Sequence, residues 1–134
     1  MALARIRQLS AHEVGHTLGL IHNFAGSANG RSTVMDYPHP MLDLRDGNIA
    51  LDKAYREGLG EWDYYAVAYG YGDHSDAERL VLVQNAKQQG LEYMADEDAR
   101  PEGGVSATGH LWDNGADLVA ELNRLGQVRQ LALR

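Results

Sequence analysis

The sequence has no cysteine among its 134 residues, which excludes disulfide bridges and cysteine-ligated metal sites. Any metal site must therefore be built from histidine, aspartate, glutamate or tyrosine side chains. The absence of cysteine does not by itself fix the compartment of the protein, because disulfides are common but not obligatory outside the cytoplasm.

Basic residues are also few: the sequence has 12 lysines and arginines against 19 aspartates and glutamates, which gives a formal net charge of −7. Nucleic-acid binding calls for a basic stripe, so we expect no nucleic-acid partner. No apolar run is long enough to cross a bilayer, and arginines interrupt residues 1–11 where a signal peptide would lie. We therefore expect one domain with a modest core, without a membrane span.

Helical spacing of apolar residues dominates the sequence and strand patterns are scarce, so the fold class is predicted to be mainly α. A long loop is expected over residues 24–52, and a short strand at "LEYM", residues 91–94. Four helices are predicted, over residues 2–18 (ended by Gly19), 61–69, 75–89, and from a cap at Asp113 or Asn114 to the C-terminus.

Three histidines and a glutamate gather in "SAHEVGHTLGLIHNF", residues 10–24. His12 and His16 are four residues apart and share one face of the predicted helix. That spacing lets two imidazole nitrogens converge on one zinc ion. A turn at Gly19 can bring His22 to the same ion as the third ligand.

Three protein ligands leave a fourth position open for water, as in catalytic zinc sites. Zinc would acidify that water, and Glu13 would take its proton as the water attacks a carbonyl carbon. The match to H-E-x-x-H-x-x-G-x-x-H arises by chance on the order of once in ten thousand chains or less. The sequence therefore predicts zinc-dependent hydrolysis.

The stretch "HEVGHTLGLIH" resembles the zinc-binding signature of the metzincin metallopeptidases, and "STVMDYPHP" resembles their Met-turn. With "GEWDYYAVAYGY", "MADEDARP" and "LWDNGADLVAELNRL", the resemblance is closest to bacterial zinc-dependent metalloproteases with a Met-zincin domain, over about residues 8–131. It implies a zincin-like active-site helix, a Met-turn loop and C-terminal helices. It further implies an endopeptidase acting on peptides or proteins in an extracytoplasmic, periplasmic or secreted, setting.

The same resemblance assigns roles to two residues after the histidines. Met35 matches the Met-turn methionine that forms a hydrophobic floor under the zinc site. Tyr37 has the spacing of a tyrosine that binds zinc or stabilises the oxyanion in the astacin and serralysin branches; the alternative is a tyrosine that packs the turn. Asn23, next to the third histidine, is expected to support the site by a hydrogen bond.

Only eleven residues precede His12, whereas metzincins place a substrate-binding sheet before this helix. We therefore expect residues 1–134 to be one partial catalytic domain without that sheet. It divides into the zinc-binding helix and turn (1–23), the Met-turn region (24–52) and a helical C-terminal subdomain (53–134). Apolar surface left on the helix makes self-association plausible, so the alternatives are a catalytically silent zinc-binding or self-associating chain, and a helical domain without metal.

Several other residues are predicted to have structural roles. "DEDAR", residues 96–100, can bind calcium through its carboxylates, but a salt-bridged or solvated surface is the favoured interpretation. His39 can line the pocket, but a solvated loop histidine is the favoured interpretation. His74 and His110 are placed at loop-to-helix junctions and are not expected to bind metal. The aromatic and apolar residues of the second helix are interpreted as packing: Trp62, Tyr65, Val67 and Tyr69.

Overall fold

A computed structural model describes residues 1–100, 106, 108, 109 and 111–134 of the chain. The described residues are mainly helical, which confirms the predicted fold class, and their only sheet is a two-stranded hairpin. The elements in chain order are α1 (Ala2–Thr17), the 3-10 helix η1 (Phe24–Gly26), β1 (Asp43–Arg45), β2 (Asn48–Ala50), α2 (Glu61–Tyr71), α3 (Asp76–Gln88), α4 (Asp96–Ala99) and α5 (Leu118–Ala132).

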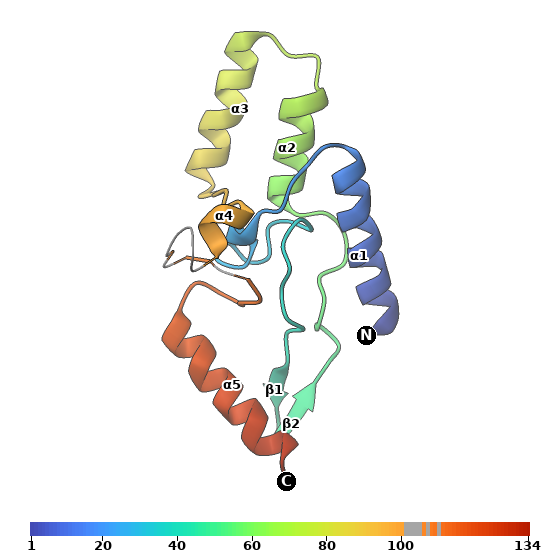
Figure 1. The fold of residues 1–134 in the computed structure, drawn as a ribbon, viewed down its shortest axis with the longest axis vertical. Coiled ribbons are helices and arrows are strands. Elements are labelled where there is room, and N and C mark those ends of the chain that lie inside the picture. Colours follow the sequence, from blue (N-terminus) through green and yellow to red (C-terminus); the bar gives the residue numbers. More distant parts are fainter. Residues whose placement is uncertain (101–105, 107, 110) are drawn as a thin grey trace.

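The elements form an elongated molecule with a helical pair at one end and the hairpin at the other (Figure 1). Helix α3 packs on α2, and α5 packs on β2. Between these ends lie η1 and α4, with α1 along one side. In the described part of the chain no helix is both long and apolar enough to span a membrane.

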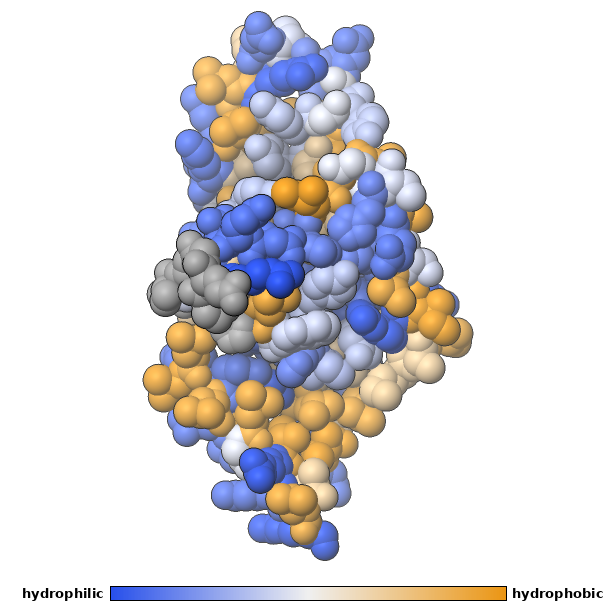
Figure 2. Space-filling view, in the orientation of Figure 1, coloured by the Kyte–Doolittle hydropathy of each residue, from blue (hydrophilic) through white to orange (hydrophobic). Residues whose placement is uncertain are grey.

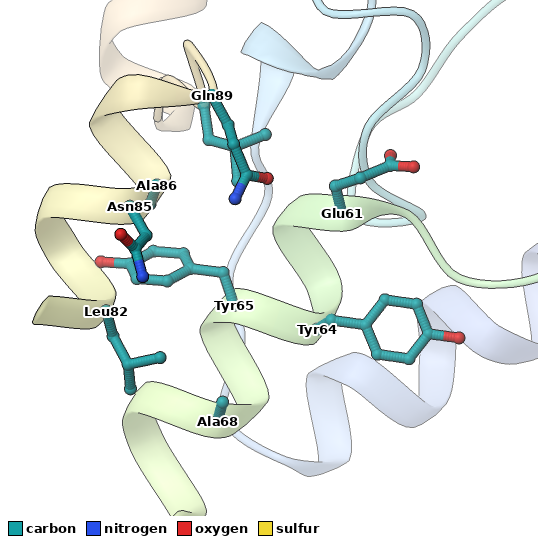
Figure 3. A pocket seen from close by; sticks show the side chains of 9 residues that line it. Glu61, Tyr64, Tyr65, Ala68, Leu82, Asn85, Ala86 and Gln89 are labelled. Carbon is teal, nitrogen blue, oxygen red and sulfur yellow. The ribbon is translucent and has the colours of Figure 1, made fainter. Parts of the chain in front are cut away.

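A pocket lies between α2 and α3, and a close view shows the side chains that line it (Figure 3). Tyr65 of α2 extends toward α3, where Leu82 and Asn85 lie beside it, while Tyr64 points to the opposite side of α2. These two tyrosines therefore have different surroundings, since Tyr65 is half-buried and Tyr64 is exposed. The shallow groove left between the helices is lined by side chains of both.

The hairpin corrects the prediction that residues 24–52 form a loop without secondary structure, as does η1 at the start of that segment. Strands β1 and β2 pair antiparallel with Asp43 opposite Ala50. Asp46 and Gly47 connect them with φ of 50° and 75°, the left-handed pair that a type I′ turn requires. The Asp-Gly dipeptide was the available sequence signal for this turn.

The helix boundaries agree with the sequence where a cap is explicit. Helix α1 ends at Thr17, and Gly19 follows with φ of 81°, a left-handed conformation that glycine adopts without strain. Ser75 caps α3 with a capping box to Glu78. The predicted cap of the last helix was wrong, because Asp117 caps α5 by accepting hydrogen bonds from the amides of Val119 and Ala120.

Asp113 and Asn114, the residues predicted to cap α5, are buried and bind other parts of the chain. The Ser27 hydroxyl donates to Asp113 (2.8 Å), and Arg31 donates to Asn114 Oδ1 (3.1 Å). The strand predicted at residues 91–94 is also absent, since this segment has no regular structure. Its backbone is held by Asn23 instead, as described below.

Two small clusters form the core. One contains Phe24, Ala25, Met94 and Ala99, and so joins η1 to α4. The other contains Val34, Met35 and Trp62, and joins the segment after η1 to α2. Packing by Trp62 is thereby confirmed, and Tyr65 packs against the second cluster, whereas Tyr69 is exposed. Two histidines of the sequence motif, His12 and His16, lie on α1, and the third, His22, lies two residues before Phe24 of the first cluster.

Candidate metal centre

The structure brings His12, His16 and His22 together. One ring nitrogen from each histidine lies within 4.8 Å of those of the other two. The two from α1 are closest, with 3.1 Å between His12 Nε2 and His16 Nε2. The ring of His22 lies 5.3 Å from that of His12 and 4.9 Å from that of His16, measured between centroids. This spacing allows a single metal ion to contact all three rings.

The Nδ1 atom of each histidine is held by an oxygen. His12 Nδ1 donates to the carbonyl of Val34 (2.7 Å), and His16 Nδ1 donates to the carbonyl of Leu20 (2.8 Å). His22 Nδ1 is 2.7 Å from a carboxylate oxygen of Asp96. A proton held on Nδ1 leaves the lone pair of Nε2 free, which fixes the tautomer that a metal ligand needs.

The Nε2 atoms are not paired as buried polar atoms normally are, since those of His12 and His16 face each other at 3.1 Å. His22 Nε2 is buried and has no hydrogen-bond partner among the described residues. His12 is 1% exposed, and burial lowers the pKa of its imidazole, so the neutral form is favoured. With Nδ1 protonated on both rings, His12 and His16 direct two lone pairs at each other. A cation satisfies all three nitrogens, so these residues fit a metal ion.

Gly15 and Gly19 allow the chain to fold around this site. The left-handed Gly19 turns the backbone after α1, and the amide of Leu20 donates to the carbonyl of Gly15 (3.1 Å). A Cβ atom on Gly15 would lie 2.3 Å from Met35 Sδ, so the fully buried methionine packs directly against this helix position. Nothing in the sequence assigns a packing role to Gly15, because its only signal is its place between His12 and His16 in the zinc motif.

The segment carrying Met35 is fixed by the first turn of α2. Asp63 is buried and accepts hydrogen bonds from Thr33 Oγ1 (2.5 Å) and from the amide of Val34. It also accepts one from the amide of Gly60 (2.7 Å). Since the carbonyl of Val34 holds His12, Asp63 supports the position of His12 through one intervening residue.

Tyr37 lies beside the histidines and also contributes to packing. Its ring centroid is 4.8 Å from that of His12 and 4.6 Å from that of His22. The same ring packs near Phe24 (6.3 Å) and Trp112 (5.5 Å). Both interpretations of Tyr37 from the sequence are compatible with this position, so its role stays a prediction.

Asp96 was not foreseen as part of the site. It begins α4, and its second oxygen accepts a hydrogen bond from Arg100 (3.2 Å), so the salt-bridged interpretation of residues 96–100 holds for this pair. Burial raises the pKa of the Asp96 carboxyl, but the hydrogen bonds from His22 and Arg100 outweigh burial and leave that pKa lowered. A link across 74 residues has no local sequence signal.

Asn23, the residue expected to support the site by a hydrogen bond, bonds to backbone groups of two neighbouring segments. It is fully buried, and its side chain accepts from the amides of Ala25 (3.1 Å) and Met94 (3.0 Å) and donates to the carbonyl of Glu92 (3.0 Å). These bonds tie the residue after His22 to the segment that precedes α4.

The other predicted site residues are placed as follows. Glu13 is exposed on α1, next to His12 in sequence. His39 and His74 do not join the histidine cluster. His110 lies outside the described residues.

A helix-borne pair of histidines, a glycine turn that delivers a third and a buried methionine against the helix define a metzincin-type domain. The whole chain, residues 1–134, matches the Met-zincin family, and the protein belongs to that family. Comparison with curated proteins and with solved structures finds no match.

Proposed function

We propose that this chain is the catalytic part of a zinc-dependent endopeptidase of the metzincin type. The observation that carries the proposal is the convergence of three histidine nitrogens whose opposite ring nitrogens are each held by an oxygen. His12, His16 and His22 would hold the ion. Family membership supports zinc as the metal. Peptides or proteins as substrates and an extracytoplasmic location are proposed from the resemblance of the sequence motifs alone.

Zinc bound by three imidazoles acts as a Lewis acid and makes water acidic enough to react at neutral pH. Glu13 accepts one proton from the attacking water as its oxygen bonds to the peptide carbonyl carbon. The same carboxyl group then gives that proton to the amide nitrogen as the C–N bond breaks. Tyr37, beside His12 and His22, would donate a hydrogen bond to the developing oxyanion.

Replacement of the general base tests this assignment. Glu13→Gln removes the proton acceptor and leaves the histidines in place, so peptide hydrolysis should fall by about a hundredfold or more. Zinc content should stay at the wild-type level. The matched control is Glu57→Gln, since Glu57 is also exposed and pairs only with Arg7 on the surface among the described contacts. Unchanged turnover in Glu13→Gln would refute the role of Glu13.

A catalytically silent, self-associating chain is the second candidate. The observation that favours it is the apolar surface of α1, where Leu3, Ile6 and Val14 are exposed. The same preparation distinguishes the two: zinc binding and self-association without hydrolysis of any peptide in a library support the silent chain. Hydrolysis that Glu13→Gln abolishes supports the enzyme.

A further inference from the structure

His22 differs from the two other histidines in the oxygen that holds it. His12 and His16 donate to backbone carbonyls, whereas His22 Nδ1 faces a carboxylate oxygen of Asp96 at 2.7 Å. The contact is partly shielded from water, with side-chain exposures of 19% for His22 and 35% for Asp96. A hydrogen bond with a charged acceptor is about twice as strong as one between neutral groups.

Asp96 is itself held in place from two directions. Arg100, one turn along α4, donates to its other oxygen at 3.2 Å. Ala99 of α4 packs in the core cluster with Phe24, two residues after His22. The backbone before α4 is joined to Asn23 and to the amide of Phe24, which donates to the carbonyl of Met94 (2.9 Å). The carboxylate and the imidazole are therefore positioned by the same small core.

We propose that Asp96 is a positioning residue for the third metal ligand: its carboxylate keeps the proton of His22 on Nδ1, directs Nε2 at the metal and strengthens zinc binding. This inference rests on the metal site of the proposed function. It also gives α4 a function, since the helix carries a carboxylate that contacts the ring of His22 directly.

The physical basis is the effect of a carboxylate on a neutral imidazole. A negative acceptor at Nδ1 increases electron density at Nε2 and so makes it a better ligand for a cation. It also opposes rotation of the ring, so less conformational entropy is lost when the metal binds. His22 needs this support most, because it lies in the non-helical segment after α1.

Two substitutions of Asp96 test the proposal. Asp96→Asn keeps the shape of the side chain and one acceptor oxygen but removes the charge, and Asp96→Ala removes both. Zinc affinity, measured by competition with a chromophoric chelator, should fall by about tenfold in Asp96→Asn and by up to about a hundredfold in Asp96→Ala. Glu97→Gln makes the same charge change at the next, exposed residue and should stay within twofold of wild type.

A second measurement uses the zinc-free chain and does not depend on activity. Ring ¹⁵N NMR at about pH 8.5, well above the ordinary pKa of an imidazole, reports which nitrogen of His22 carries the proton. Wild type and Glu97→Gln should show Nδ1–H, and Asp96→Ala should shift the proton toward Nε2. Thermal unfolding followed by circular dichroism establishes that the variants are folded.

The outcomes separate this proposal from the proposed function. Zinc binding by wild type, with affinity and tautomer unchanged in both Asp96 variants, overturns the role of Asp96 and leaves the metal site standing. A wild-type chain that binds no zinc overturns the proposed function. In that case, an unchanged His22 tautomer in Asp96→Ala overturns the role of Asp96 as well. A shifted tautomer supports the role of Asp96 in keeping the proton of His22 on Nδ1.

Discussion

At the scale of single residues, Gly15 shows how closely the chain packs under the histidines. Helix propensity alone favours alanine over glycine by about 1 kcal/mol, but a Cβ at this position would meet Met35 Sδ at 2.3 Å. Met35 is fully buried, and its sulfur would have to shift to admit a methyl group on Gly15. The close approach of helix and sulfur therefore explains the glycine.

We predict that Gly15→Ala lowers the free energy of unfolding by about 1–3 kcal/mol, because the added methyl group overpacks the site. Gly126→Ala is the matched control: this glycine also lies within a helix, and a Cβ there meets nothing within 4 Å. The control should raise stability by about 0.5–1 kcal/mol. Urea unfolding measures both, and equal stabilisation by the two substitutions would contradict the packing.

Asp36 lies between Met35 and Tyr37 and carries a buried carboxyl group. Burial, followed by repulsion from Asp113, raises its pKa to about 7, and the amide of Tyr37 and the charge of Arg31 oppose the shift only in part. Asp36 Oδ2 has no hydrogen-bond partner among the described residues. The folded chain therefore holds a proton here that the unfolded chain loses near pH 4.

This difference predicts the direction of a pH dependence. Between about pH 4 and pH 7 the folded state binds more protons at Asp36, so this group's contribution to stability falls as the pH rises, by up to about 1.4 kcal/mol per unit. Asp36→Asn cannot ionise and should flatten that decline. Chemical unfolding of the zinc-free chain across this range tests it, and identical pH profiles for the two chains would argue against a protonated Asp36.

At the scale of elements, the first turn of α2 holds the segment that supports His12. Asp63→Ala would leave the amides of Val34 and Gly60 and the Thr33 hydroxyl without their acceptor. Buried donors left unpaired cost about 1–3 kcal/mol each. We predict a loss of stability of about 3 kcal/mol or more, together with weaker zinc binding.

Glu61→Gln is the control for Asp63, because Glu61 lies in the same turn but is exposed and pairs with Arg56 on the surface. Its effect should stay within about 0.5 kcal/mol. Urea unfolding and chelator competition measure both variants. A folded Asp63→Ala chain with wild-type stability would show that α2 does not support the site.

The elements themselves were predictable where the signals are local. Helical periodicity predicted α1, α2 and α3, and Ser75 with Glu78 predicted where α3 begins. The hairpin was missed although Asp46 and Gly47 carry its turn signal. The predicted start of α5 was wrong because Asp113 accepts a hydrogen bond from the Ser27 hydroxyl instead of capping the helix. Tertiary contacts of this kind leave no local pattern in the sequence.

The candidate site likewise combines features that have a local sequence signal with features that have none. The spacing of His12 and His16 on a helix is local, and Gly19 marks the turn before His22. The partners that hold these rings are not local, since Val34 is 22 residues from His12 and Asp96 is 74 residues from His22. Sequence reasoning therefore found the three histidines and missed what orients them. Their role as zinc ligands stays a prediction.

At the scale of the whole molecule, large apolar side chains are exposed on several helices. Hydrophobic residues gather near the N-terminal end of α1 and over the end of the molecule formed by α5 and the hairpin (Figure 2). Leu3 and Ile6 on α1, and Leu122 on α5, are among the exposed residues. Apolar surface of this kind favours association.

We predict that the isolated chain self-associates in a concentration-dependent manner, measured by sedimentation velocity. Ile6→Glu should shift the distribution toward the monomer, because it places a charge on the apolar face of α1. Leu80→Glu is the control, since Leu80 is as exposed as Ile6, both at 58%, but lies on α3, in the helical pair at one end of the molecule. A monomer at every concentration would exclude self-association.

The central claim is that His12, His16 and His22 form one zinc site, and X-ray absorption spectroscopy of the zinc-loaded chain tests it most directly. We expect about one zinc per chain with three imidazole nitrogens in its coordination shell, and loss of one imidazole in His22→Ala. A zinc-loaded chain whose metal has an all-oxygen shell, or a chain that retains no zinc after dialysis, would contradict it.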